Sequence, residues 1–296
     1  MLPDTHVQPT GFASLYSARQ RLTPTLGATA VLTRGTFLMD ENSDDIILKG
    51  GVRIVTLSSW QEFHQKADGL KSRRGYVWRG QKKDETSGWS LQSSFDRKVQ
   101  SVNQGDRTKK LKHHLETFKE AMNRSYPNVL PQDDVDIWAL GQHYGLKTPL
   151  LDWTLSPYIA AYFAFSEGID QNERDDNYRY VFALNRSLER LLSKRKKASQ
   201  VLSSDRSVPF IDQLPYPSPR FTAQQGVFTK AFQGNDIRKY VQSFSGKRPS
   251  EVVIVKFRIP TKDREECLRD LHSRKINHVS LLLDLRDVVD HCNGNL

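Results

Sequence analysis

The stretch from Ile137 to Glu167 constrains the fold most, because apolar helical patterns flank a short and unusually specific polar segment. In its first part, apolar residues recur at helical spacing behind Asp133 or Asp134, and either aspartate can cap a helix. Its second part begins with Ser156 and Pro157, an N-cap residue followed by a proline at the first helical position. The pattern therefore predicts two apolar helices joined by a tight loop and a polar corner.

The polar corner is Asp152-Trp153-Thr154, and a Gln-His-Tyr-Gly turn at residues 142–145 precedes it. A polar corner between two buried helices is a place where a concave binding site can form. A purely structural interpretation stays open beside this one. In that interpretation Asp152 hydrogen-bonds the loop, while Trp153 and His143 are partly buried for packing alone.

The second informative stretch ends a predicted β-strand with an arginine and a glycine. Tyr76, Val77 and Trp78 favour the strand, and Arg79 falls at its end beside Gly80. A guanidinium presents a planar fork of donors that suits phosphate or carboxylate groups. Arg79 is therefore a candidate ligand-binding residue, although an exposed strand-end arginine without a ligand fits the same pattern.

The third informative stretch places Gln224 and Gln225 before Gly226, between aromatic residues. A glutamine amide both donates and accepts hydrogen bonds, so it can hold an amide or a hydroxyl group of a ligand. A polar turn between two strands is an equally good interpretation of the same residues.

The rest of the chain mixes strand and helix patterns without regular βαβ alternation. The predicted strands are residues 52–57, 178–184, 251–257 and 276–285. An amphipathic helix with lysines on its outer face is predicted at about residues 107–123. This mixture predicts an α+β fold with a mixed central sheet and flanking helices. Residues 1–51 contain few long apolar runs and are predicted to be an N-terminal arm or a partner-binding segment, followed by one domain at residues 52–296.

The composition bounds the partners and the compartment. The formal net charge is +10 and the sequence pI is about 9.5, which favours polyanionic partners such as nucleic acid or an acidic protein. The two cysteines, Cys267 and Cys292, fit no metal-ligand spacing, so no metal site is predicted. So few thiols, together with the lack of an apolar run that could span a bilayer, predict a cytoplasmic protein without a membrane segment.

Taken together, the three informative stretches resemble the FRG domain, a family named for a Phe/Tyr-Arg-Gly motif. The resembling segments are Trp78-Arg79-Gly80-Gln81, Gln142–Gly145, Thr148–Thr154, Ser156-Pro157, Ala160–Ala164, Arg220 and Gln224–Phe228. Trp78 stands where the motif has Phe or Tyr, which is a mild departure. The resemblance extends over about residues 53–285 and implies that residues 52–296 form an FRG-like domain.

The order of the motifs also resembles that of ADP-ribosyltransferases, at the level of the fold. This resemblance implies that Arg79 on a first strand holds NAD and that Thr154 and Ser156 belong to a second motif. Gln225 or Glu251 would then act near the chemistry. The candidate catalytic residues are therefore Arg79, Gln225, Glu251 and, as the other carboxylate, Asp152.

The chemistry of NAD suits these residue types. An arginine can hold the pyrophosphate, and an aromatic ring such as Tyr144 or Trp153 can stack on the nicotinamide. A glutamine or glutamate can bind a ribose hydroxyl or orient the acceptor. The implied NAD-binding residues are Arg79, Gly80, Gln81, His143, Tyr144, Trp153, Thr154, Ser156, Tyr162 and Phe163.

Three functions are consistent with the sequence. The leading hypothesis is an NAD-dependent ADP-ribosyltransferase-like enzyme, a toxin of bacterial or phage conflict that modifies nucleic acid or protein and has an antitoxin or regulatory protein as partner. The second is a non-enzymatic basic module that binds nucleic acid or another partner. The third is a hydrolase or nuclease that uses Asp152, His143 and Glu251, against which stands the lack of a metal-ligand spacing.

Overall fold

The computed structural model describes residues 46–48, 51–71, 75–166, 177–188, 210–212, 214, 218–230, 234–245 and 252–281. The chain divides into two units, Met1–Ser43 and Asp44–Leu296, and every described residue belongs to the second unit. Most of the predicted N-terminal arm, and the candidate catalytic residue Glu251, therefore lie outside the described residues.

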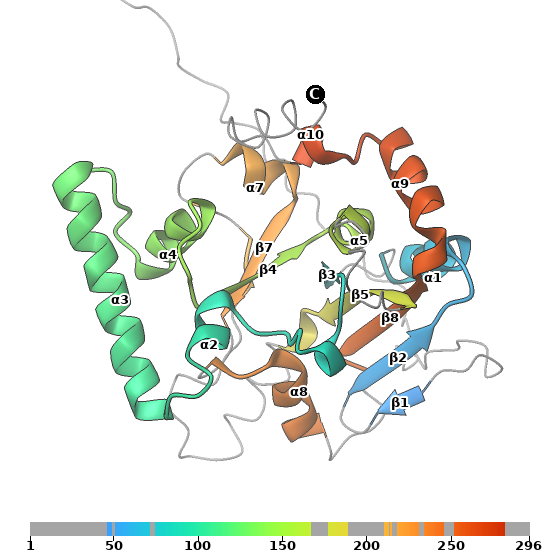
Figure 1. Cartoon of the computed structure of the whole chain (residues 1–296), viewed down its shortest axis with the longest axis horizontal. Coiled ribbons are helices and arrows are strands. Elements are labelled where there is room, and N and C mark those ends of the chain that lie inside the picture. Colours follow the sequence, from blue (N-terminus) through green and yellow to red (C-terminus); the bar gives the residue numbers. More distant parts are fainter. Residues whose placement is uncertain are drawn as a thin grey trace, which may run out of the picture. The chain divides into compact units, whose positions relative to one another are not determined.

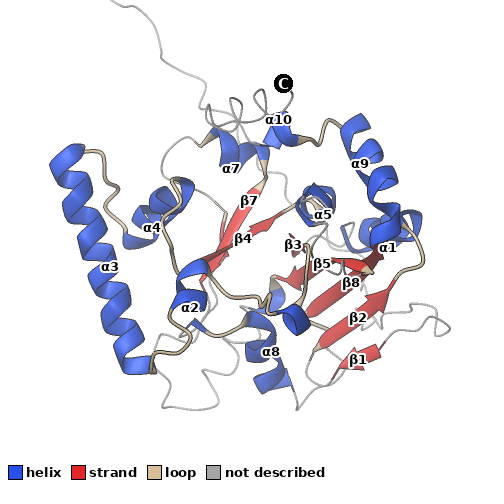
Figure 2. Cartoon of the chain, in the orientation of Figure 1, coloured by secondary structure: helices blue, strands red, loops and turns tan. Residues whose placement is uncertain are grey.

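A mixed sheet forms the centre of the second unit. Its strands are β1 (Ile46–Leu48), β2 (Val52–Thr56), β3 (Tyr76–Gln81), β4 (Leu150–Thr154), β5 (Tyr178–Asn185), β6 (Phe210–Ile211), β7 (Gly226–Lys230) and β8 (Ile254–Pro260). They form one 8-stranded sheet in the order β1-β2-β8-β5-β3-β4-β7-β6. The pair β2–β8 is parallel and the other neighbours pair antiparallel. With the helices that flank this sheet (Figure 2), the predicted α+β class is confirmed.

Helices lie against both faces of the sheet. They are α1 (Trp60–Lys71), α2 (Ser94–Lys98), α3 (Gln104–Ser125), α4 (Asp134–His143), α5 (Pro157–Ser166), α7 (Pro219–Ala223), α8 (Ile237–Ser245), α9 (Arg264–Ser273) and α10 (His278–Leu281). Two positions of β8 that are three residues apart point to opposite faces of the sheet. Phe257 contacts Phe63 of α1, whereas Ile254 belongs to a buried cluster with Ile237 and Val241 of α8. Figure 1 shows α3 beside α4, on the side of the sheet that carries β4 and β7. Among the described residues, no helix combines the length and the apolar character that crossing a bilayer requires.

Local capping confirms the two helices predicted around the polar segment. The backbone N–H of Val135 donates to Asp133 Oδ1 at 2.7 Å, which starts α4. Gly145 follows the end of α4 with a φ of 88°, a left-handed conformation that glycine adopts without strain. The backbone N–H of Ile159 donates to Ser156 Oγ at 3.3 Å, which caps α5.

Three local predictions are wrong. Arg79 and Gly80 do not end their strand, because β3 continues to Gln81 and both residues pair with β5. The predicted polar corner at residues 152–154 is part of strand β4, because Leu150 to Thr154 pair along their length with Lys230 to Gly226 of β7. That pairing joins segments far apart in the chain, so the local pattern does not reveal it. The strand predicted at residues 276–285 is helical at His278–Leu281, where Asn277 Oδ1 accepts a hydrogen bond from the Ser280 backbone N–H at 3.0 Å.

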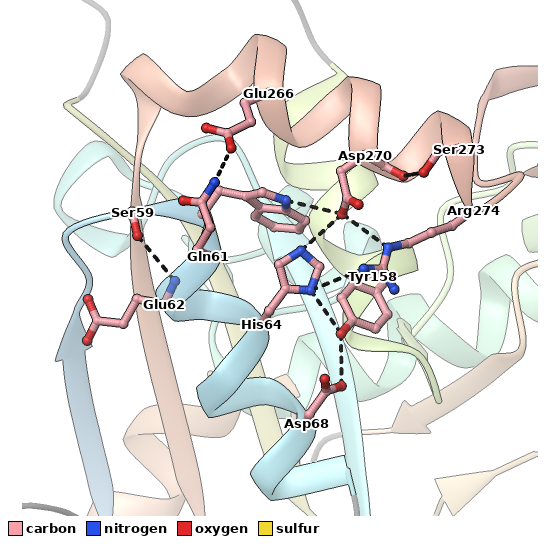
Figure 3. A network of polar contacts seen from close by, with 11 residues as sticks. Ser59, Gln61, Glu62, His64, Asp68, Tyr158, Glu266, Asp270, Ser273 and Arg274 are labelled. Carbon is pink, nitrogen blue, oxygen red and sulfur yellow. Dashed lines mark hydrogen bonds and ion pairs between the residues drawn. The ribbon is translucent and has the colours of Figure 1, made fainter.

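A polar network fixes α5 against α1 and α9 (Figure 3). Asp270 Oδ2 of α9 accepts a hydrogen bond from Trp60 Nε1 at 3.2 Å and lies 3.0 Å from His64 Nε2 of α1. His64 Nδ1 lies 3.1 Å from the Tyr158 hydroxyl of α5, which donates to Asp68 Oδ1 at 2.8 Å. Burial and the hydrogen bond with Asp68 raise the pKa of Tyr158 to about 12. These contacts hold the start of α5, the helix that also borders the pocket described next.

Candidate functional site

The sheet opens between β3 and β4. Among the described residues these two strands pair at Trp78 and Thr154 alone, whereas β3 pairs with β5 along its whole length. In Figure 1, β4 and β7 lie side by side in the part of the sheet near α4 and α7, while β3 lies beside β5. A pocket of about 380 Å³ lies at this opening. Its lining residues are Trp78, Arg79, Gly80, Gln81, Lys82, Trp89, Gln142, Asp152, Trp153, Thr154, Ala160, Phe163, Ser166, Arg220 and Gln224.

The glycine of the Arg-Gly motif lets α5 approach the strand that carries the arginine. A Cβ atom added at Gly80 would lie 1.7 Å from the backbone oxygen of Ala160 and 2.8 Å from the backbone nitrogen of Ala164. A side chain at this position would therefore push α5 off β3. The glycine is required by this close backbone contact, and the small residues of α5 are its counterpart.

Arg79 joins the two strands across the opening. Its Nη1 donates to the backbone oxygen of Asp152 at 2.8 Å and lies 3.9 Å from Asp152 Oδ2. Its buried Nε has no hydrogen-bond partner among the described residues. Burial lowers the pKa of Arg79, the negative charge of Asp152 opposes this shift, and the positive charge of Arg97 adds to it. Because arginine starts from a very high pKa, Arg79 remains a cation at neutral pH.

Asp152 is the carboxylate of the pocket. Its side chain is 63% exposed, and Oδ1 accepts a hydrogen bond from Gln142 Nε2 at 2.5 Å. Gln142 Oε1 in turn accepts from the Thr148 hydroxyl, and Thr148 is fully buried. This chain of hydrogen bonds holds an accessible carboxylate in one orientation beside a guanidinium.

Two smaller pockets adjoin the main one, and Gln142 and Asp152 line all three. One of about 90 Å³ is lined by Ala139, Gln142, His143, Asp152, Trp153, Leu214, Ser218, Arg220, Phe221, Gln224, Gly226 and Phe228. The other, of about 220 Å³, is lined by Arg79, Ser94, Arg97, Gln142, Gly145, Leu146, Lys147, Leu150, Leu151 and Asp152. Asp152 therefore stands where three concave surfaces meet.

The structure brings most of the predicted site residues to these pockets. Those that line the main pocket are Arg79, Gly80, Gln81, Asp152, Trp153, Thr154 and Phe163, and His143 lines the smallest pocket. Gln81 is 3% exposed, and its Oε1 has no hydrogen-bond partner among the described residues. An unpaired buried acceptor costs about 1–3 kcal/mol, so a ligand N–H that reached it would relieve a real penalty.

Other predicted residues lie away from the described pocket linings. Ser156 is buried as the cap of α5, and Tyr162 is buried in that helix. Tyr144 is 75% exposed and makes an edge contact with His143. Glu251 lies outside the described residues.

Of the two adjacent glutamines, only Gln224 lines a described pocket. Gln224 lines the main pocket, and its backbone oxygen accepts from the Thr154 hydroxyl at 2.7 Å. Gln225 has a φ of 47°, an exposed side chain, and a backbone oxygen that accepts from the Leu155 N–H at 3.0 Å. The left-handed turn therefore points the predicted catalytic Gln225 away from the position that its neighbour occupies.

Several residues that line the pocket are not among the site residues predicted from the sequence. Gln142 belongs to the Gln-His-Tyr-Gly motif, so that motif was the signal for it. Trp89 is 38% exposed, an unusual exposure for so large an apolar side chain, and it borders the pocket. Lys82 and Arg220 add positive charge to the lining. Arg220 belongs to the segments that resemble the FRG domain, whereas no local pattern marks Trp89 or Lys82 as a pocket residue.

A buried ion pair fixes the loop that carries Trp89. Lys256 of β8 is 3% exposed, and its Nζ donates to Asp84 Oδ2 at 2.5 Å and to Glu85 Oε2 at 3.1 Å. Arg238 of α8 also binds Glu85. The Trp89 backbone N–H donates to the Asp84 backbone oxygen at 2.9 Å, so the anchored loop fixes the position of Trp89 beside the pocket.

We expect Asp84→Asn to make the free energy of unfolding depend less steeply on pH in the acid range. Burial alone would raise the pKa of Asp84, but hydrogen bonds from Lys256 and Thr86 outweigh it, and the pKa is lowered. Since the folded pKa lies below the unfolded value of about 3.9, this group stabilises the fold at neutral pH. That stabilisation disappears as the pH falls from about 5 through the folded pKa. Urea unfolding across this range should therefore show a shallower slope in the variant, and an unchanged slope would contradict this role of Asp84.

Among the described residues, no group of histidine, cysteine, aspartate and glutamate side chains is arranged to hold a metal ion. The arrangement instead combines cations, one oriented carboxylate and aromatic surfaces. Such a site can bind an anionic ligand with a flat ring and can act on it through the carboxylate.

Comparison with known proteins matches one family. The FRG domain matches residues 74–173, which include β3, α2, α3, α4, β4 and α5. No curated protein and no solved structure matches the chain. The matched region contains Arg79, Gly80, Gln142 and Asp152, the residues around which the pocket is built. The chain therefore contains a segment, residues 74–173, that matches the FRG domain.

Proposed function

We propose that the main pocket binds NAD and that the protein transfers its ADP-ribosyl group to an acceptor. The observation that carries this proposal is the Arg79 guanidinium, which bridges the opening of the sheet beside the oriented Asp152 carboxylate. The Arg79 guanidinium suits the pyrophosphate of NAD, and the Asp152 carboxylate suits the positive charge that develops on the ribose when the nicotinamide bond breaks.

The rest of the lining supports both ends of such a ligand. Arg79, Lys82 and Arg220 supply positive charge for the pyrophosphate. Trp89 and Phe163 offer ring faces on which a flat heterocycle can stack. The Oε1 atom of Gln81 is an acceptor that the carboxamide N–H of nicotinamide would satisfy.

The proposed reaction replaces one bond to the ribose carbon by another. The bond between the nicotinamide nitrogen and the ribose carbon breaks, and nicotinamide leaves with the bonding electron pair. An acceptor oxygen or nitrogen then donates a lone pair to the cationic ribose carbon. Asp152 stabilises the developing positive charge and takes any proton that the acceptor loses, while Gln142 keeps the carboxylate in place. Chemistry of this kind would make the protein a toxin toward a cell whose acceptor it modifies.

Arg79→Ala is expected to lower the rate of nicotinamide release from NAD by about 10-fold to 100-fold, because a charged hydrogen bond to the ligand is lost. Arg79→Lys should recover only part of the rate, since lysine keeps the charge but not the planar fork. Chromatography of nicotinamide and calorimetric titration with NAD measure the two effects.

Arg269→Ala is the matched control, because Arg269 is an exposed arginine of α9 whose removal changes the net charge equally. It should leave NAD binding and nicotinamide release unchanged. A folded wild-type protein that neither binds NAD nor releases nicotinamide would overturn the proposal.

A further inference from the structure

The pocket of about 220 Å³ differs in character from the main pocket, because its described lining contains no aromatic residue. It contains the positively charged side chains of Arg79, Arg97 and Lys147, with Asp152 as its one carboxylate among the described lining residues. Below it is called the basic groove. Because Arg79, Gln142 and Asp152 line both this groove and the main pocket, the two spaces meet at the proposed reactive carboxylate.

Hydrogen bonds join the two segments that line the basic groove, α2 and the loop before β4. The Phe95 N–H of α2 donates to the Thr148 backbone oxygen at 3.1 Å, and the Thr148 N–H donates to Ser94 Oγ at 3.1 Å. Arg97 Nη1 donates to the Gln92 backbone oxygen, which directs this guanidinium. The groove is therefore a built surface in which α2 carries Arg97, the loop between α4 and β4 carries Lys147, and β3 carries Arg79.

Positive charge continues from the groove onto α3. His114 Nε2 of α3 lies 3.0 Å from the Lys147 backbone oxygen, and the His114 ring stacks on Phe95 with 5.9 Å between centroids. Lys110 lies one helical turn before His114 and thus on the same side of α3, where it is exposed. The net charge of the chain, +10, also favours the approach of a polyanion to this surface.

We propose that the basic groove is the acceptor subsite and that the acceptor is a single-stranded nucleic acid. This inference rests on the proposed function. Phosphates of the strand contact Arg97 and Lys147, and the following phosphates run toward Lys110 on α3. The strand must be unpaired at the reacting nucleotide, because the base atoms of a duplex are paired and stacked and cannot enter a pocket.

The transfer step follows from where the two spaces meet. NAD in the main pocket presents its ribose carbon to Asp152, and a nucleotide in the basic groove reaches the same carboxylate, which lines both spaces. A lone pair on a base or terminal oxygen of the strand forms the new bond as nicotinamide leaves with the old electron pair. Any proton on the attacking atom passes to Asp152, so atoms and charge balance.

The first experiment measures binding of a fluorescently labelled single-stranded oligonucleotide at several salt concentrations. Each phosphate contact on a single strand contributes about 0.7 to the slope of log affinity against log salt, so Arg97→Ala/Lys147→Ala should lower that slope by about 1.4. The control, Lys262→Ala/Arg269→Ala, removes the same charge from exposed positions near and on α9 and should keep the wild-type slope. Equal slopes for the groove variant and the control would overturn the groove as a nucleic-acid site.

The second experiment separates acceptor choice from NAD cleavage. Wild-type protein is incubated with NAD and the oligonucleotide, nicotinamide is quantified, and ADP-ribosylated oligonucleotide is detected by mass spectrometry. We expect the groove variant to lower the fraction of cleaved NAD that reaches the oligonucleotide by at least about tenfold, in line with two lost charged contacts.

The outcomes distinguish the two proposals. Release of nicotinamide with no modified oligonucleotide, or with modification of added protein instead, overturns the nucleic-acid acceptor and leaves the proposed NAD chemistry standing. NAD that stays intact under all conditions overturns the proposed function, and the acceptor role falls with it.

Discussion

Asp152→Asn is expected to lower the rate of nicotinamide release by about 10²-fold to 10⁴-fold, the range found when a positioned acid or base is removed. Asparagine keeps an oxygen that can accept the hydrogen bond from Gln142 Nε2, so the local geometry should survive. The negative charge that stabilises the ribose cation and accepts a proton is lost. The measurement is kcat/KM for NAD with the wild-type protein and the variant.

The control for this prediction is stability, because the Asp152 side chain is largely exposed and paired to Arg79 at the long distance of 3.9 Å. An exposed pair of this kind is worth about 0–1 kcal/mol, so the melting temperature should hardly change. A variant that melts like the wild type and still releases nicotinamide at the wild-type rate would show that Asp152 has no role in the chemistry.

Gly80→Ala is expected to destabilise the protein by about 3 kcal/mol or more, at the upper end of the cost of overpacking a core. The added methyl group would meet the backbone of α5, 1.7 Å from the Ala160 oxygen, and a helix backbone cannot rotate away as a side chain can. Relief requires α5 to move off β3, which also widens the pocket. Urea unfolding of the two proteins measures the difference.

Gly69→Ala is the matched control. Gly69 lies within α1, and a Cβ atom there meets nothing within 4 Å. Alanine in place of glycine inside a helix should stabilise the protein by up to about 1 kcal/mol. Equal stability changes at Gly80 and Gly69 would show that the contact between α5 and β3 yields easily, against the packing described above.

The two predictions test different parts of the same site. Gly80 governs the approach of α5 to β3, and Asp152 on β4 is the proposed reactive carboxylate. A loss of stability at Gly80 together with a loss of activity at Asp152 would separate the framework of the site from its chemistry.

Local chemistry in the sequence determined the framework of the site. The aspartate cap of α4 and the Ser156-Pro157 start of α5 were readable because caps act over three or four residues. The Arg-Gly motif identified Arg79 and Gly80, although both lie within β3 and not at its end, and the resemblance carried by the motifs identified the FRG domain. The α+β class followed from the order of strand and helix patterns.

Only the tertiary structure decided how these pieces form a pocket. The strand character of Asp152 depends on pairing with β7, and the opening beside Arg79 depends on β3 and β4 separating after one residue pair. Gln224 lines the pocket, whereas Gln225 has a left-handed backbone and is exposed, although the two side chains are chemically identical. The Lys256 anchor that positions Trp89 joins residues more than half a chain apart. Long-range pairing and backbone geometry leave little trace in neighbouring residues, so the sequence supplied the reactive groups and the fold decided which of them meet.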